Sequence, residues 1–184
     1  ALRILRGPDL NSRKLPPQGT DMRLKGLLAR LGIGRPTAAD AEPLFMNMPD
    51  GELAEIARTS QKTLPHFRAL LAATEDPDMS CLVKTFIPDP DGKGMWLWLS
   101  VESVEESGFD ARVFEAPARF PGITPGSSRF VANEEIGDWA VNLGGVLHGG
   151  YSLRLQRERL PASERAAYDA YIGAQKYAPL PQLQ

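Results

Sequence analysis

The chain has 184 residues, of which 42% are hydrophobic and 24% charged, enough apolar material for one globular core. Its formal net charge of −2 lacks the basic excess of nucleic-acid-binding proteins, so we expect no nucleic-acid partner. The single cysteine, Cys81, excludes an internal disulfide and a multi-cysteine metal site. No apolar run approaches the roughly 20 residues of a membrane-spanning helix. The first residues also lack an apolar signal core, so we expect a cytoplasmic protein.

Residues 1–49 are expected to lie outside the main domain. Residues 1–21 are rich in Pro, Gly, Asn, Ser and Gln, which predicts a surface tail. Leucines at helical spacing in residues 22–32 predict a short basic helix that packs on its own domain or contacts a membrane surface. Residues 33–49 carry three prolines, which predicts a Pro/Gly-rich linker.

Two helical segments are predicted at the start of the main domain. Asp50 is a suitable N-cap, and acidic residues follow it near the positive end of the helix. Thr63 can cap a second segment, in whose first turn Pro65 is tolerated. This second segment is expected to end near Thr74, before a run of Asp and Pro.

From residue 81 onward the pattern changes to strands. Residues 81–87 are β-branched and aromatic and precede a dense turn signal. In residues 95–104 an aliphatic face alternates with a face that holds Trp96 and Trp98, which strongly favours a strand. A turn leads to a further strand over residues 109–116, so these two strands are expected to form an antiparallel hairpin.

The later elements complete an α+β domain over residues 50–178. We predict a strand at 128–132, a turn or helical stretch near 134–139, a strand at 151–156 and a final helix from Ser163 to about Gln175. The expected fold is an antiparallel sheet of four to five strands with helices packed on one face, plus the N-terminal helical extension. Residues 179–184 are predicted to be a C-terminal tail.

Several segments, taken in order, resemble a small bacterial family called domain of unknown function 2314. They are Ala57–Phe67, Val83-Lys84, Met95-Trp96-Leu97, Ile136–Trp139 and Gly149–Arg154. The resemblance covers roughly residues 52–160. It implies a compact α+β domain and supplies no established activity. The tryptophan-bearing strand of this family is often entered through an acidic residue and a histidine, whereas Lys93 and Gly94 stand there in this chain.

The candidate binding residues centre on the pair Asp138 and Trp139. In one interpretation Trp139 anchors the core, while Asp138 caps a turn or pairs with Arg154. In the other, these residues and Tyr151 line one groove whose arginine fork suits a carboxylate or phosphate group. The side chains of Trp96 and Trp98 would then extend its aromatic wall.

His148 lies between two glycine pairs, which allow either close ligand approach or tight turns. Asp138 is the acid that would pair with it, but we expect no such dyad because each segment has a sufficient structural explanation. The chain contains no phosphate loop, no Gly-x-Ser-x-Gly elbow and too few histidines for a three-histidine metal site. No catalytic residue, metal or cofactor is therefore predicted.

Four acidic residues lie near the tip of the predicted hairpin: Glu102, Glu105, Glu106 and Asp110. They form either a solvated turn or a docking surface for a basic partner. Because no coherent catalytic constellation is found, we predict a non-enzymatic protein-binding or accessory domain with a protein partner. A specific version is an immunity-type inhibitor of a toxin. The alternative is a small-ligand-binding protein or enzyme with a pocket at Asp138, Trp139, His148, Tyr151 and Arg154.

Overall fold

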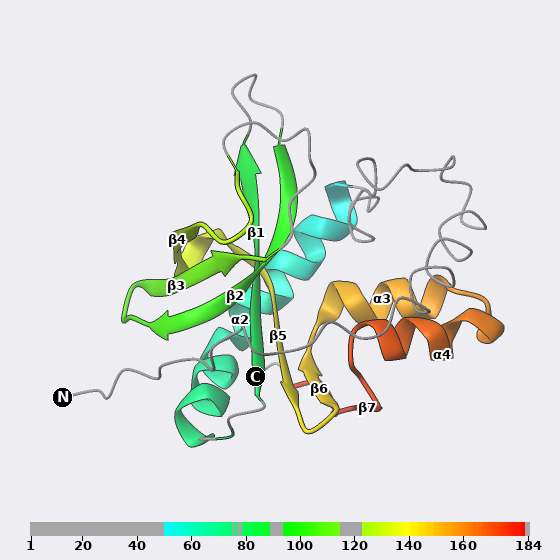
Figure 1. The fold of residues 1–184 in the computed structure, drawn as a ribbon. Helices are drawn as coiled ribbons and strands as arrows, with labels where there is room; N and C mark the ends of the chain where they lie inside the picture. The colour runs from blue at the N-terminus through cyan, green and yellow to red at the C-terminus, as the bar shows by residue number, and fades with distance from the viewer. Residues whose placement is uncertain (1–49, 75, 77–78, 89–93, 115–122, 183–184) are drawn as a thin grey trace.

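A computed structural model describes residues 50–74, 76, 79–88, 94–114 and 123–182 (Figure 1). The predicted tail, short helix and linker of residues 1–49 lie outside these described residues, as does most of the expected turn after residue 88. The described part has the predicted α+β class, with helices packed against a mostly antiparallel sheet.

The first described element is a single long helix, α2 (Asp50–Ala73), with Asp50 and Glu52 in its first turn. The prediction of two segments separated at Thr63 was wrong, because α2 continues through Pro65. The Thr63 hydroxyl does not cap a new helix: it donates to the Thr59 carbonyl one turn earlier, at 3.0 Å. The predicted end near Thr74 is confirmed. Among the described helices, none combines the length and hydropathy that would let it cross a membrane.

The sheet has seven strands in the order β4-β3-β2-β1-β5-β6-β7 (Figure 1). All neighbours are antiparallel except the short parallel pair β6–β7. The strands are β1 (Ser80–Pro88), β2 (Gly94–Val104), β3 (Gly108–Val113), β4 (Ser128–Ala132), β5 (Ile136–Leu143), β6 (Val146–Gly149) and β7 (Lys176–Tyr177). The β2–β3 hairpin and the strand at 128–132 are confirmed.

The expected count of four to five strands was too low, because three strands have no periodic signal. Residues 136–141 of β5 are all buried, so this interior strand lacks the alternation of a half-exposed one. The predicted turn or helix is not found there, and only the short 3-10 helix η3 (Asn133–Glu135) is present before β5 begins. Strands β6 and β7 have four and two residues, too few for a pattern to be recognised.

The strand predicted at residues 151–156 is instead the helix α3 (Tyr151–Arg159). Its apolar residues alternate because the helix is buried on two opposite sides. Tyr151 and Leu155, one turn apart, pack in the core beneath α2, while Leu153 packs in a second core. The predicted final helix is α4 (Ala162–Tyr171), which ends earlier than expected, before Gly173 with its positive φ of 71°.

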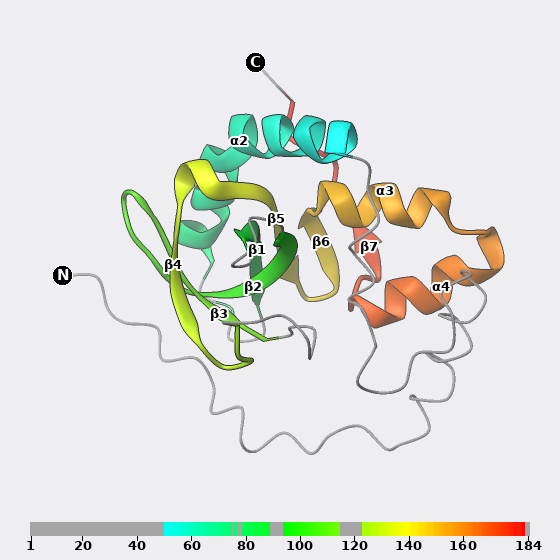
Figure 2. The ribbon, with the colours of Figure 1, turned by 90° about the horizontal axis from the view of Figure 1, so that it is seen from above.

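Apolar side chains are buried on both faces of the sheet. Along β1, Val83 belongs to the first core with Phe67 of α2, whereas the neighbouring Leu82 packs in the second core with Leu147 and Leu153. Helix α2 therefore covers one face, and α3 and α4 pack at the end of the sheet where β6 and β7 lie (Figures 1 and 2). The prediction that all helices pack on one face was wrong, because strands β1, β2 and β5 need cover on both sides.

Trp139 of β5 is the largest fully buried side chain of the first core. Its ring stacks on Phe67 at a centroid distance of 5.1 Å, and its Nε1 donates to the Thr63 Oγ1 at 3.0 Å. Gly149 of β6 lies directly against the ring: a Cβ built there would be 2.5 Å from it. Trp139 is thus a core residue rather than part of an open groove.

We predict that Trp139→Ala lowers the free energy of unfolding by about 3–5 kcal/mol, because it removes a packed aromatic ring and leaves a cavity. Urea unfolding followed by circular dichroism measures this loss. The matched control is Trp96→Ala, whose ring is partly exposed and should cost clearly less. An unchanged unfolding midpoint for Trp139→Ala would contradict the core assignment.

Candidate functional site

The carboxylate of Asp138 is completely buried and accepts hydrogen bonds from several donors. The backbone N–H groups of Trp139, Tyr151 and Ser152 donate to it at 2.8, 3.2 and 2.7 Å, and the Ser60 hydroxyl approaches it at 3.4 Å. Two of these N–H groups belong to the first turn of α3, where the helix dipole favours a negative charge. Burial raises the pKa of the Asp138 carboxyl, and these donors oppose that rise.

Lys84 is the cationic partner of this carboxylate. The two residues stand opposite each other in the β1–β5 ladder, and Lys84 is only 1% exposed. Its Nζ donates to the Ser152 Oγ at 3.3 Å and lies 5.6 Å from the centroid of the Trp98 ring. Burial lowers the pKa of the Lys84 amine to about 8, against the attraction of Asp138. Lys84 was not among the predicted site residues, although a lone charge in an apolar strand was a signal that could have found it.

A lysine amine beside a serine hydroxyl and an aspartate is chemically a set that can activate a nucleophile. Here Lys84, Asp138 and Ser152 are 1%, 0% and 0% exposed, so no substrate reaches them in this structure. The cluster connects β1 and β5 to the first turn of α3. Its role in this conformation is to position that helix on the sheet.

His148 does not join this cluster. It pairs with Val141 in the β5–β6 ladder, on the side of Trp139 and α2, whereas Asp138 is bound to α3. Burial, together with the charges of His66 and Arg154, lowers the pKa of the half-buried His148. Within the described residues, no group of three or more His, Cys, Asp or Glu side chains could hold a metal ion.

One interpretation of the sequence expected Arg154 to pair with Asp138, but the structure does not contain this pair. Its Nε donates to the Gly149 carbonyl at 2.7 Å, and its Nη2 donates to the carbonyls of Leu147 and Ala178 at 2.9 and 2.8 Å. These bonds connect α3 to β6 and to the segment after β7. Arg154 is therefore a cation held by backbone carbonyl groups.

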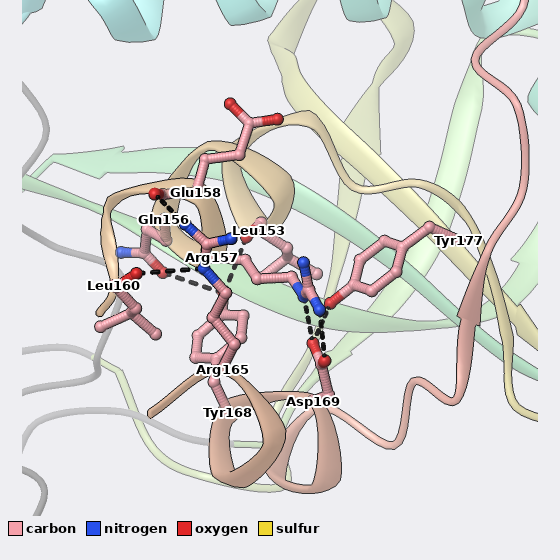
Figure 3. Close-up of polar contacts among 9 residues, drawn as sticks. All are labelled: Leu153, Gln156, Arg157, Glu158, Leu160, Arg165, Tyr168, Asp169 and Tyr177. Atoms are coloured by element: carbon pink, nitrogen blue, oxygen red, sulfur yellow. Dashed lines mark hydrogen bonds and ion pairs between the residues drawn. The ribbon is translucent and has the colours of Figure 1, made fainter. Parts of the chain in front are cut away.

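A second arginine of α3, Arg157, makes a bidentate ion pair with Asp169 of α4, at 2.7 and 2.8 Å (Figure 3). The Tyr177 hydroxyl also donates to Asp169, and this carboxylate has a lowered pKa because Arg157 binds it. Arg165 of α4 donates in turn to the carbonyls of Leu160 and Glu158 (Figure 3). Sequence reasoning missed this network because residues 151–156 were predicted as a strand, so Arg157 was not expected on a helix that packs beside Asp169 of α4.

Beside this network the surface has a hollow of about 370 Å³. Of the residues predicted to form a groove, only Tyr151 and Arg154 line it. Trp98 is 5% exposed and lies against Lys84, and the Trp96 ring packs on Phe86 at 5.6 Å. The expected aromatic wall is therefore not formed. The complete lining consists of Tyr151, Arg154, Leu155, Arg157, Glu158, Tyr177 and Leu180.

The predicted acidic cluster divides into two parts. Glu102 binds Arg112 and accepts from the Ser128 hydroxyl at 2.8 Å, and Asp110 accepts from the Ser103 hydroxyl at 2.8 Å, so both serve contacts within the sheet. Glu105 and Glu106 are exposed in the turn between β2 and β3.

The fold adds two acids that were not predicted from the sequence. Asn133 of η3 donates through its side chain to the Glu106 carbonyl at 3.0 Å, and its backbone N–H donates to Ser107 at 2.9 Å. These bonds place the exposed Glu134 and Glu135 beside the hairpin turn. We call this group the acidic tip: Glu105, Glu106, Glu134 and Glu135.

Comparison with known families decides the relationship of this chain. A family model described as an uncharacterized protein conserved in bacteria (DUF2314) matches residues 50–175. The chain belongs to the DUF2314 family. No curated protein and no solved structure matches it. The segments Val83-Lys84, Ile136–Trp139 and Gly149–Arg154, on which the resemblance to DUF2314 depended, meet around the buried Asp138 carboxylate.

The buried amine of Lys84 predicts a specific pH dependence of stability. Its pKa is about 8 in the folded protein, against 10.5 for an ordinary lysine. Below about pH 8 the Lys84 amine is protonated in both the folded and the unfolded protein, and burial of its charge opposes folding. Between about pH 8 and 10.5 the unfolded chain binds more protons, so the free energy of unfolding rises with pH.

We therefore expect the free energy of unfolding of the wild type, relative to Lys84→Met, to increase by about 3 kcal/mol from about pH 8 to 10.5. Denaturant unfolding across this range measures the difference. Lys62→Met is the matched control, because it replaces a lysine that is exposed on α2 rather than buried. A flat difference for Lys84→Met would show that the amine is not buried as a titrating group.

Proposed function

We propose that this DUF2314 protein is a non-enzymatic protein-binding domain that recognises a basic protein surface through its acidic tip. The main support is where its charges lie. The groups with catalytic potential, Lys84, Asp138 and Ser152, are buried and bound to one another. The four glutamates of the acidic tip are exposed and gathered at one end of the sheet.

Hydrogen bonds from α2 hold the acidic tip in place, so this surface is preorganised. Arg68 donates to the Asn133 side chain at 2.7 Å and contacts the Glu106 and Gly108 carbonyls at 3.3 and 3.4 Å. Gln61 donates to the carbonyls of Asn133 and Ile136, both at 2.7 Å. A surface that is already ordered loses little conformational entropy when a partner binds.

An apolar side chain suited to the centre of an interface lies next to the acidic tip. Phe130 of β4 is 44% exposed and packs against Gly108, where an added Cβ would be 2.7 Å from its ring. Exposed aromatic residues frequently contribute most of the binding energy, and surrounding charges direct the encounter. Phe130 with the acidic tip would fit a partner surface that carries Lys or Arg around an apolar recess.

An immunity-type inhibitor is the specific form of this proposal. Many toxins that act on anionic substrates need a basic surface, and a small acidic domain can block such a surface by charge complementarity. Co-expression of the chain with a toxin tests this form. The small-ligand or enzyme alternative has weaker support, because only Tyr151 and Arg154 of its five residues line the hollow.

The test is a peptide-display selection against the immobilised full chain, followed by binding kinetics of the selected peptides. We expect peptides rich in Lys and Arg, and we expect Glu105→Lys/Glu106→Lys to slow their association about tenfold or more at low salt, and less in high salt. Asp50→Lys/Glu55→Lys is the matched control, with the same charge change at exposed positions outside the acidic tip and the hollow.

Two results would refute the proposal: selected peptides without a basic bias, or equal losses in the two double variants. For the immunity form, the chain is co-expressed with a toxin encoded beside it. Restored growth that the tip variant loses and the control variant keeps would support that form. Protection that both variants keep would exclude the acidic tip as the inhibitory surface.

A further inference from the structure

The hollow beside α3 is separate from the acidic tip and has the dimensions of a small-molecule site. Its volume of about 370 Å³ lies within the range of about 300–1,000 Å³ for ligand pockets. One wall is a single face of α3, because Tyr151, Arg154, Leu155 and Glu158 recur at helical spacing. The opposite wall is formed by Tyr177 and the segment that follows it.

Arg154 in this hollow is a half-buried cation whose hydrogen-bond partners are all neutral. Its Nε and Nη2 are used by three carbonyl groups, and within the described residues its Nη1 donates to no protein oxygen. Arg157 on the same helix differs, since Asp169 supplies its counter-ion. Burial lowers the pKa of Arg154, and the nearby Tyr177, Tyr151, Asp138 and Glu158 side chains oppose this lowering.

Both guanidinium groups lie against the ring of Tyr177. The Cζ atoms of Arg154 and Arg157 lie 5.1 and 4.9 Å from its centroid. Figure 3 shows Arg157, Tyr177 and Asp169, whose carboxylate accepts a hydrogen bond from the Tyr177 hydroxyl. Fixed donors lose little side-chain entropy on binding a ligand. Planar arginine donors suit the two oxygens of a carboxylate.

We propose that this hollow binds a small carboxylate with an apolar body. The carboxylate receives the Nη1 hydrogens of Arg154, and the apolar body contacts Leu155 and Leu180. Glu158 on the same wall repels a second negative charge, which disfavours phosphate. The chemistry is shared by a free small acid and by the C-terminal carboxylate of a peptide.

The test titrates each probe into the full chain and measures binding by calorimetry and by the shifts of the NMR resonances of Tyr177 and Leu155. The probes are N-acetyl-phenylalanine, its neutral amide, inorganic phosphate and an acetylated Gly-Gly-Phe peptide with a free C-terminus. We expect the acid to bind at least tenfold more tightly than the amide or phosphate. Tighter binding of the peptide would assign the site to chain ends, and tighter binding of the single residue would assign it to small acids.

Two substitutions test how nearby charge changes the affinity for the acid. Both leave Arg154 in place, because its loss could unfold the domain. Leu180→Glu places a negative charge at an exposed rim position and should weaken binding of the acid about twofold to fivefold relative to Leu180→Gln. Glu158→Gln should strengthen it by a similar factor. Equal binding of acid and amide, tighter binding of phosphate, or equal affinities for Leu180→Glu and Leu180→Gln would overturn the proposal.

Discussion

The buried carboxylate of Asp138 is the interaction on which the arrangement of this fold depends. It lies on the interior strand β5 and joins Ser60 of α2, Lys84 of β1 and the first turn of α3. An isolated charge in this position would cost several kcal/mol, and the surrounding donors offset part of that cost. The direction of α3 is fixed by this requirement, because its N-terminal N–H groups must face the carboxylate.

The closure of that cluster determines where function can reside. A lysine, a serine and an aspartate in contact would suggest catalysis if they were open to solvent, but here they hold elements together. The surfaces that remain lie at the two ends of the sheet. The acidic tip is beside β3 and β4, and the hollow is beside α3 and β7, with the sheet order placing β4 and β7 at opposite edges (Figures 1 and 2). The proposed partner surface and the proposed ligand site therefore lie at opposite ends of the sheet.

The two arginines of α3 show how burial and pairing separate residues of the same type. Arg157 has a carboxylate partner, and its charge is satisfied within the protein. Arg154 is bound to the carbonyl ends of three peptide groups, which position its guanidinium but do not neutralise it. Such a cation connects structural elements through its hydrogen bonds, and its charge also favours the binding of an anion.

Local sequence patterns were enough to predict the family, the α+β class, the end of α2, the β2–β3 hairpin and the strand at 128–132, because ordered motifs, a run of Asp and Pro, turn residues and alternating residue types are all local features. They could not show β5, whose residues are buried on both sides, and they made α3 look like a strand, because two opposite faces of that helix are buried. Three arrangements appear only in the folded chain: Lys84 meets Asp138, Glu134 and Glu135 complete the acidic tip, and Arg154 faces a hollow. The reason is physical: such contacts depend on strand order and chain direction, which local periodicity does not encode.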